Sequence, residues 1–178
     1  MIKMDPKETS SYFGLANIYE QSGDYERAEK MLTDARDARP NDSAVYMQLA
    51  GFYNRQGEFD KTIDAFQQRA DREPNNPEAW HTIGSYIQDK VHRDKGLDKK
   101  KQMDYILAGI AADDKALALN SEYFEALTYK NILLRMQANL EKDPVKQKQL
   151  IQQADDLQKK AMAVRDKQAT AAPATKPK

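Results

Sequence analysis

The sequence contains no cysteine and only two histidines among its 178 residues. The absence of cysteine excludes disulfides, thiol catalysis and cysteine-ligated metal sites. The histidines, His81 and His92, lie 11 positions apart, whereas two metal ligands on one helix face are usually four apart. The seven glycines form no phosphate-binding loop. We therefore interpret both histidines as surface residues, and the sequence predicts no metal site and no cofactor.

Long hydrophobic runs are also missing. No apolar stretch approaches the roughly 20 residues of a membrane-spanning helix, and residues 1–6 do not form a signal peptide. As written, the chain is expected to be soluble and cytoplasmic, or periplasmic if a signal-bearing N-terminus has been removed. The sequence leaves the compartment open.

Residue patterns typical of catalysis are missing as well. The acidic pairs at 113–114 and 155–156 fall in expected helices beside Lys115 and Lys159, which is typical of solvated helix faces rather than acid/base catalysis. The serines lack the context of a nucleophile. We expect a protein that is not an enzyme.

What the sequence does contain is a repeat. Proline recurs at 34-residue intervals, at Pro6, Pro40 and Pro74, and a period of about 34 residues is typical of a helical repeat. Between Tyr12 and Pro40, two stretches with apolar residues at helical spacing flank Ser22-Gly23-Asp24, a helix stop followed by a cap. One unit is therefore predicted to be two helices joined by a tight turn.

The repeat predicts the organisation of the whole chain. We place helix pairs at about 9–40, 43–74, 77–120 and 122–168, a remnant of a preceding repeat at 1–6, and a disordered tail rich in Ala, Pro and Lys at 169–178. The third unit is 13 residues longer than the period, and we place the extra residues between its helices, around 92–101, with a second helix at about 98–119. The last helix is expected to be a polar-faced cap.

The order aromatic, Leu, small, Tyr, then Ala, large apolar, Ala, Pro resembles the tetratricopeptide repeat. The first unit matches at every signature position, and the second departs from the pattern at Thr62 and Arg69. The third and fourth units match progressively less well, and their greater length is similar to that of bacterial members of this family with extended C-terminal repeats. The signature positions are Tyr12, Leu15, Ala16, Tyr19, Ala28, Leu32, Ala35 and Pro40.

The resemblance implies an all-α fold, an α-α superhelix of about four helix pairs with the last two elongated. It also implies a non-catalytic scaffold that binds a peptide or partner protein in a groove lined by the first helix of each pair. Residues next to the packing positions are expected to line that groove: Phe13, Asn17, Met47, Gln48, Asn54, Arg55, His81, Ser85, Gln88, Asp89, Thr128 and Arg135.

One specific ligand of the family is not expected. Members that bind the acidic C-termini of chaperones clamp carboxylates with Lys, Asn and Arg, but of the matching positions here only Asn17 agrees, and Glu78 would repel a carboxylate. Two alternatives stay open. One alternative to the scaffold is a self-association module that uses uncovered array ends, and the other is an accessory domain of a longer repeat polypeptide. The partner itself stays unidentified.

Charge is divided along the chain. Residues 1–89 contain 10 basic and 16 acidic residues, a net −6, and the remainder carries +6. The basic segment 90–101 is interrupted by Asp94 and Asp98 and has no aromatic residue for base stacking, so we do not predict nucleic-acid binding. We expect this segment to be a mobile loop that decorates the array or closes over one end of the groove.

Overall fold

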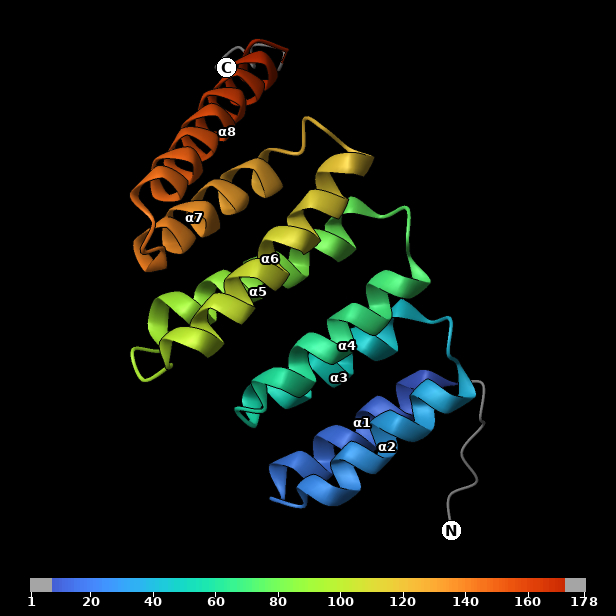
Figure 1. The fold of residues 1–178 in the computed structure, drawn as a ribbon. Helices are drawn as coiled ribbons and strands as arrows, with labels where there is room; N and C mark the ends of the chain where they lie inside the picture. The colour runs from blue at the N-terminus through green and yellow to red at the C-terminus, as the bar shows by residue number, and fades with distance from the viewer. Residues whose placement is uncertain (1–7, 172–178) are drawn as a thin grey trace, which may run out of the picture. The chain divides into compact units, whose positions relative to one another are not determined.

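The computed structural model describes residues 8–171, and within these residues every regular element is an α-helix (Figure 1). The helices follow one another in pairs without any strand in the described range, which confirms the all-α helical-repeat fold. The expected repeat remnant at 1–6 and the tail beyond 171 lie outside the described residues. The chain divides into two compact units, Met1–Pro74 and Asn75–Lys178, which are described separately.

Unit 1 contains the first two helix pairs, α1 (Thr9–Gln21) with α2 (Tyr25–Ala38), and α3 (Ser43–Arg55) with α4 (Phe59–Arg72). The turns within both pairs use a glycine with positive φ, +79° at Gly23 and +76° at Gly57, a conformation that side chains with a Cβ rarely adopt. The carboxylate of Asp24 then accepts the backbone N–H of Arg27 and caps α2. The predicted stop and cap are therefore confirmed.

Packing inside unit 1 follows the repeat signature. Ala28 and Ala35 are fully buried, as is Ala50, and these small residues allow the paired helices to approach closely. The larger side chains of Tyr46 and Leu49 on α3 are also buried. The signature residues therefore serve the architecture of the repeat.

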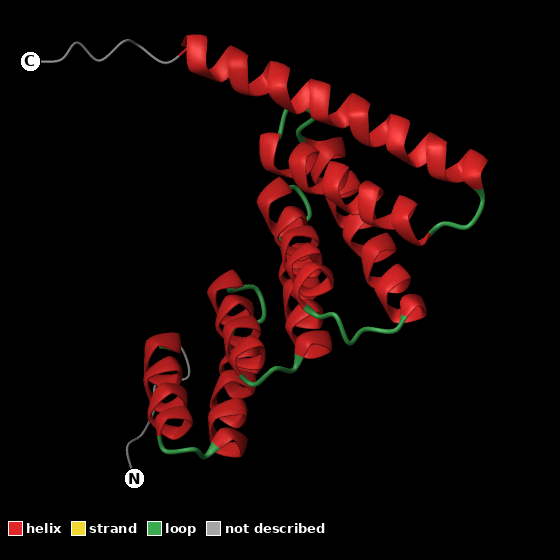
Figure 2. Cartoon of the chain, turned by 90° about the vertical axis from the view of Figure 1, so that its left-hand side faces the viewer, coloured by secondary structure: helices red, strands yellow, loops and turns green. Residues whose placement is uncertain are grey.

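Unit 2 contains four longer helices, α5 (Pro77–Arg93), α6 (Lys99–Leu119), α7 (Phe124–Leu140) and α8 (Pro144–Ala171) (Figure 2). They have 17, 21, 17 and 28 residues, against 13 or 14 in unit 1, so the prediction that the later pairs are elongated is confirmed. The expected loop at 92–101 is wrong in extent, because only residues 94–98 separate α5 from α6. The extra residues lengthen both helices, and α8 continues to Ala171, three residues into the segment expected to be a tail.

The core of unit 2 lies where α5, α6 and α7 meet. Ile87, Ile106 and Leu133 are fully buried there. Gly109 of α6 lies so close to the neighbouring helices that an added Cβ would be 2.9 Å from Leu133 Cδ1 and 3.0 Å from Ile87 Cγ2. Helix α8 packs on α7, with Ala161 and Val164 in a cluster around Leu127.

Candidate functional site

The first helices of unit 1 carry six of the twelve expected groove residues. Phe13 on α1 is half-buried, and Asn17 on the same helix is exposed. On α3, Gln48 and Asn54 are exposed and Met47 is 42% exposed. Among the residues that the structure describes, the three amides form no hydrogen bond. They are available to bond an extended peptide backbone.

The sixth residue, Arg55, is already engaged. Its Nε and Nη2 donate to the two carboxylate oxygens of Glu20 at 2.7 and 2.9 Å, which joins the end of α1 to the end of α3. This bidentate bonding holds the pKa of Glu20 below its usual value. Glu20 lies three residues after Asn17, about one turn of α1, so the two side chains share a face of that helix. The ion pair between Glu20 and Arg55 therefore brings the polar faces of α1 and α3 to the same side of unit 1.

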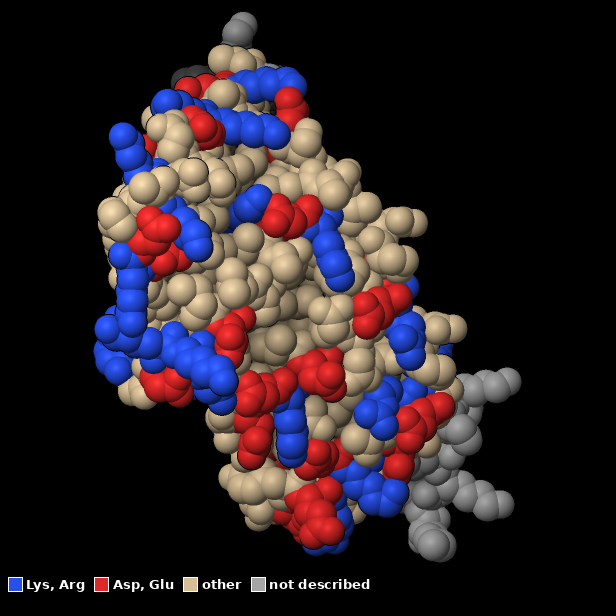
Figure 3. Space-filling model, in the orientation of Figure 1, with Lys and Arg blue, Asp and Glu red and all other residues tan. Residues whose placement is uncertain are grey.

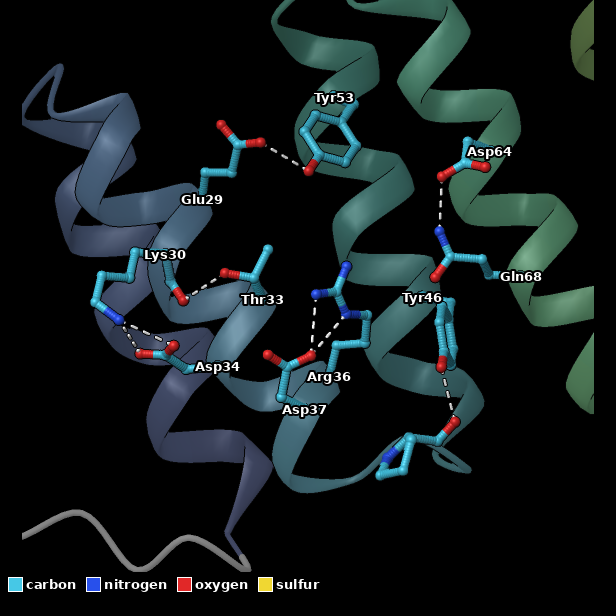
Figure 4. A network of polar contacts seen from close by, with 11 residues as sticks. Glu29, Lys30, Thr33, Asp34, Arg36, Asp37, Tyr46, Tyr53, Asp64 and Gln68 are labelled. Carbon is cyan, nitrogen blue, oxygen red and sulfur yellow. Dashed lines mark hydrogen bonds and ion pairs between the residues drawn. The ribbon is translucent and has the colours of Figure 1, made fainter.

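Other contacts fix the neighbouring side chains of unit 1, as Figure 4 shows for the second-repeat tyrosines. The hydroxyl of Tyr53 donates to Glu29 Oε1 on α2 at 2.8 Å, and burial together with this bond raises the pKa of Tyr53. Tyr46 donates to the carbonyl of Pro40 at 2.8 Å. Both tyrosines therefore link successive repeats, which leaves them little freedom to bind a ligand.

In unit 2, four of the expected groove residues bond within the protein. The hydroxyls of Ser85 and Thr128 donate to carbonyls of their own helices, and Asp89 pairs with Arg93 at 2.6 Å. Arg135 bridges α7 and α8, donating to Asp155 at 2.6 Å and to Gln158 at 3.0 Å. Gln88 is half-buried. The polar face of unit 2 is therefore more internally satisfied than that of unit 1.

The remaining expected groove residue, His81, is buried, and the interpretation of it as a surface histidine is wrong. It is 8% exposed, and its Nδ1 lies 2.9 Å from Oδ1 of Asp113, which is completely buried on α6. The imidazole contacts the rings of Tyr123 and Tyr129 edge-on, at 5.3 and 5.1 Å between centroids. The other histidine, His92, is exposed, so the interpretation as a surface residue is correct for His92.

The interpretation of Asp113 as part of a solvated face is wrong for the same reason. Burial raises the pKa of its carboxyl to about 6, although the bond to His81 opposes the shift. Its Oδ2 has no hydrogen-bond partner among the described residues, and an added Cβ at Gly84 would lie 2.7 Å from it. The sequence does contain a signal, because Asp113 interrupts the buried stripe of Ile106, Gly109 and Ala116.

The other acidic residues of the two pairs are surface ion-pair partners. Asp114 pairs with Lys130, a residue of α7, rather than with its neighbour Lys115. Lys115 instead places its ammonium 3.8 Å from the centroid of the Trp80 ring, a cation–π contact. Across the described residues no group of three or more His, Asp or Glu side chains is arranged to hold a metal ion.

A family model described as "Tetratricopeptide repeat" matches residues 1–51 and 20–84. The chain is a tetratricopeptide repeat protein. The match covers both helix pairs of unit 1 and the start of α5, where the signature is also most complete. Proteins of this family bind protein partners and are generally non-catalytic.

Solved structures extend the fold comparison over most of this tetratricopeptide repeat protein. The crystal structure of MamA has a TM-score of 0.60 at 18% identity and covers 93% of this chain and 83% of that chain. The MamA RS-1 ArsTM double mutant has a TM-score of 0.58 at 15% identity and covers 93% of this chain and 79% of that chain. At these identities the likeness shows the fold alone. A comparison with curated proteins gave no match.

The two departures of the second repeat from the family signature have physical explanations. Thr62 is fully buried and satisfies its hydroxyl by donating to the carbonyl of Glu58 at 3.0 Å. Arg69 is 9% exposed, with its guanidinium 3.2 Å from the sulfur of Met47 and 3.4 Å from the carboxylate of Glu73. Both therefore occupy positions for small residues without leaving the packed repeat.

No helix in the described range is long and apolar enough to cross a membrane.

Proposed function

We propose that the chain is a non-catalytic scaffold that binds an extended peptide segment of a partner protein on the first-helix face of unit 1. The observation that carries the proposal is the set of exposed amides on α1 and α3, Asn17, Gln48 and Asn54, which lack hydrogen bonds within the described residues. An extended peptide presents alternating N–H and C=O groups that such amides can donate to and accept from. The partly exposed Met47 beside them offers an adaptable apolar contact.

The ion pair between Arg55 and Glu20 supports the proposal in another way. It holds α1 and α3 together without covering Asn17 or Gln48, which remain exposed. A surface fixed before binding loses less conformational freedom when a ligand arrives. We therefore assign Arg55 the role of positioning the surface, and the direct contacts to the amides and Met47.

The test is affinity capture with the folded chain as bait, compared with the triple variant Asn17→Ala/Gln48→Ala/Asn54→Ala. Each lost hydrogen bond is worth about 1 kcal/mol, so the loss of all three should lower the affinity for a captured partner about 100-fold. Arg55 is left intact because it is assigned a positioning role, so its loss would not test a direct contact with the partner.

The matched control is Gln67→Ala/Gln68→Ala on α4, whose amides bond Asp71 and Asp64 of the same helix. It should retain the partner. Undiminished binding by the triple variant, with an unchanged melting curve, would show that the first-helix face of unit 1 is not the site.

Self-association is the second candidate, and Ile18 is the observation that favours it. Ile18 is 61% exposed, whereas Phe52, at the same position one repeat later, is 2% exposed. In stacked repeats this position is covered by the preceding repeat, so a second copy of the chain could cover it at Ile18. If so, mass measured by light scattering should rise with concentration, and Ile18→Glu should abolish the rise. A constant monomer mass for the unmodified chain would contradict this candidate.

A further inference from the structure

A cavity of about 210 Å³ opens at the end of unit 2 where α5 turns into α6 and α7 ends. Its floor is apolar and is formed by Val91, Ile106 and Met136, one from each of the three helices. Its polar lining includes Lys95, Gln102 and Asn139. The cavity lies inside a single compact unit and shares no residue with the first-helix face of unit 1.

The turn beside the cavity carries uncompensated positive charge. Lys90 and Arg93 are neutralised by ion pairs with Asp94 and Asp89. By contrast Lys95, Lys99 and Lys100 are exposed and form no ion pair among the described residues. Figure 3 shows the resulting cluster of basic side chains over the turn between α5 and α6, along one edge of the molecule in this view.

We propose that this end of unit 2 binds an acidic peptide segment that inserts one apolar side chain into the cavity. The lysines supply charge complementarity for the flanking carboxylates, and the floor removes the apolar side chain from water. The amides of Gln102 and Asn139 suit the peptide backbone, because each can both donate and accept. The site is additional to the proposed face of unit 1 and does not depend on it.

The structure favours a peptide over other polyanions. A membrane surface presents headgroups but no single side chain that would enter the cavity and reach its apolar floor. Single-stranded nucleic acids bind mainly through bases stacked on aromatic rings, and the cavity is lined by no Phe, Tyr or Trp, only by the smaller imidazole of His92. On α6 the ring of Tyr105 already lies 5.3 Å from the ammonium of Lys101.

The experiment is an NMR titration of the full chain, isotope-labelled, with the peptide Ser-Glu-Asp-Leu-Asp-Glu-Ser. Resonances of Ile106, Met136 and Gln102 should shift on binding. Two variants test the two parts of the site: Lys99→Glu/Lys100→Glu reverses the charge, and Asn139→Trp fills the cavity from its exposed rim. Each is expected to weaken binding at least about tenfold. The charge reversal should not damage folding, because acidic residues are favourable in the first turn of a helix.

The matched control is Lys159→Glu/Lys160→Glu, an equal change of charge on the exposed face of α8. This control should bind as the unmodified chain does, whereas the peptide with glycine in place of leucine should bind at least about tenfold more weakly. Three outcomes would overturn the proposal: equal weakening by the control pair, equal binding of the glycine peptide, or shifts that map outside the cavity. Tighter binding of anionic phospholipid vesicles or of an oligonucleotide than of the peptide would overturn it too.

Discussion

Replacement of His81 by phenylalanine is expected to lower the free energy of unfolding by about 3 kcal/mol at pH 8, the upper end of the usual loss when a buried polar group is left without its hydrogen-bond partner. Phenylalanine preserves the ring between Tyr123 and Tyr129, so the loss does not arise from an empty cavity. It arises because the fully buried carboxylate of Asp113 loses the imidazole that bonds it at 2.9 Å.

The loss should shrink as the pH falls. Burial already raises the pKa of Asp113 from 3.8 to about 6 in the folded chain, so between these values the folded state binds more protons than the unfolded state. The cost of the buried charge is therefore fully present above pH 6 and is relieved as the pH falls towards 3.8, by about 3 kcal/mol in total. Without His81 the pKa of Asp113 rises further, so at pH 5 its carboxyl is protonated. The His81→Phe variant should therefore regain most of its lost free energy of unfolding at pH 5.

Urea unfolding followed by the fluorescence of Trp80 measures this effect. Trp80 is the single tryptophan, is 6% exposed and lies on α5 next to His81, so it reports on unit 2. His92→Phe is the matched control, since His92 is exposed, and should change stability little. Asp113→Asn in the His81→Phe background should remove the pH dependence. A loss for His81→Phe that is the same at pH 5 and pH 8 would show that the charge of Asp113 is not its cause.

The repeat could be predicted from the sequence wherever local rules determine the structure. The turn at 22–24 follows from a glycine that tolerates positive φ and an aspartate that caps the next helix. The helix pairs of unit 1 follow from apolar spacing and the 34-residue period. The turn depends on neighbouring residues and the helix pairs on a regular spacing, and both can be recognised without knowing how the helices pack.

The sequence was less informative where a side chain's partner lies far along the chain. Glu20 and Arg55 are 35 positions apart, and His81 and Asp113 are 32 apart, so the exposure of each depends on how helices pack. The predicted loop at 92–101 was wrong in extent for another reason. It was placed there because the third unit exceeds the 34-residue period by 13 residues. In the structure Asp94 pairs with Lys90 in the last turn of α5 and Asp98 caps α6, so these residues stabilise two helix ends.

Replacement of Gly109 by leucine is expected to lower the free energy of unfolding of unit 2 by about 3 kcal/mol, at the upper end of the usual cost of overpacking. A Cβ at this position already meets Leu133 at 2.9 Å and Ile87 at 3.0 Å, and both neighbours are fully buried and cannot move into solvent. The change removes a glycine from a helix interior, which by itself would stabilise α6 by about 1 kcal/mol. The expected loss is therefore a measure of how tightly α5, α6 and α7 pack.

Gly14→Leu separates the two contributions. Gly14 also lies inside a helix, but an added Cβ there meets nothing within 4 Å. The free energy of unfolding of this variant, measured by circular dichroism, should therefore rise by up to about 1 kcal/mol. Leu133→Ala vacates the space next to Gly109, and alone should cost about 2 to 5 kcal/mol through the cavity it leaves. Combined with Gly109→Leu, it should cost clearly less than the sum of the single losses, because one side chain fills the space left by the other. Strictly additive losses would mean that Gly109 and Leu133 do not share this contact, and that the close approach of α6 to α7 is not what requires glycine.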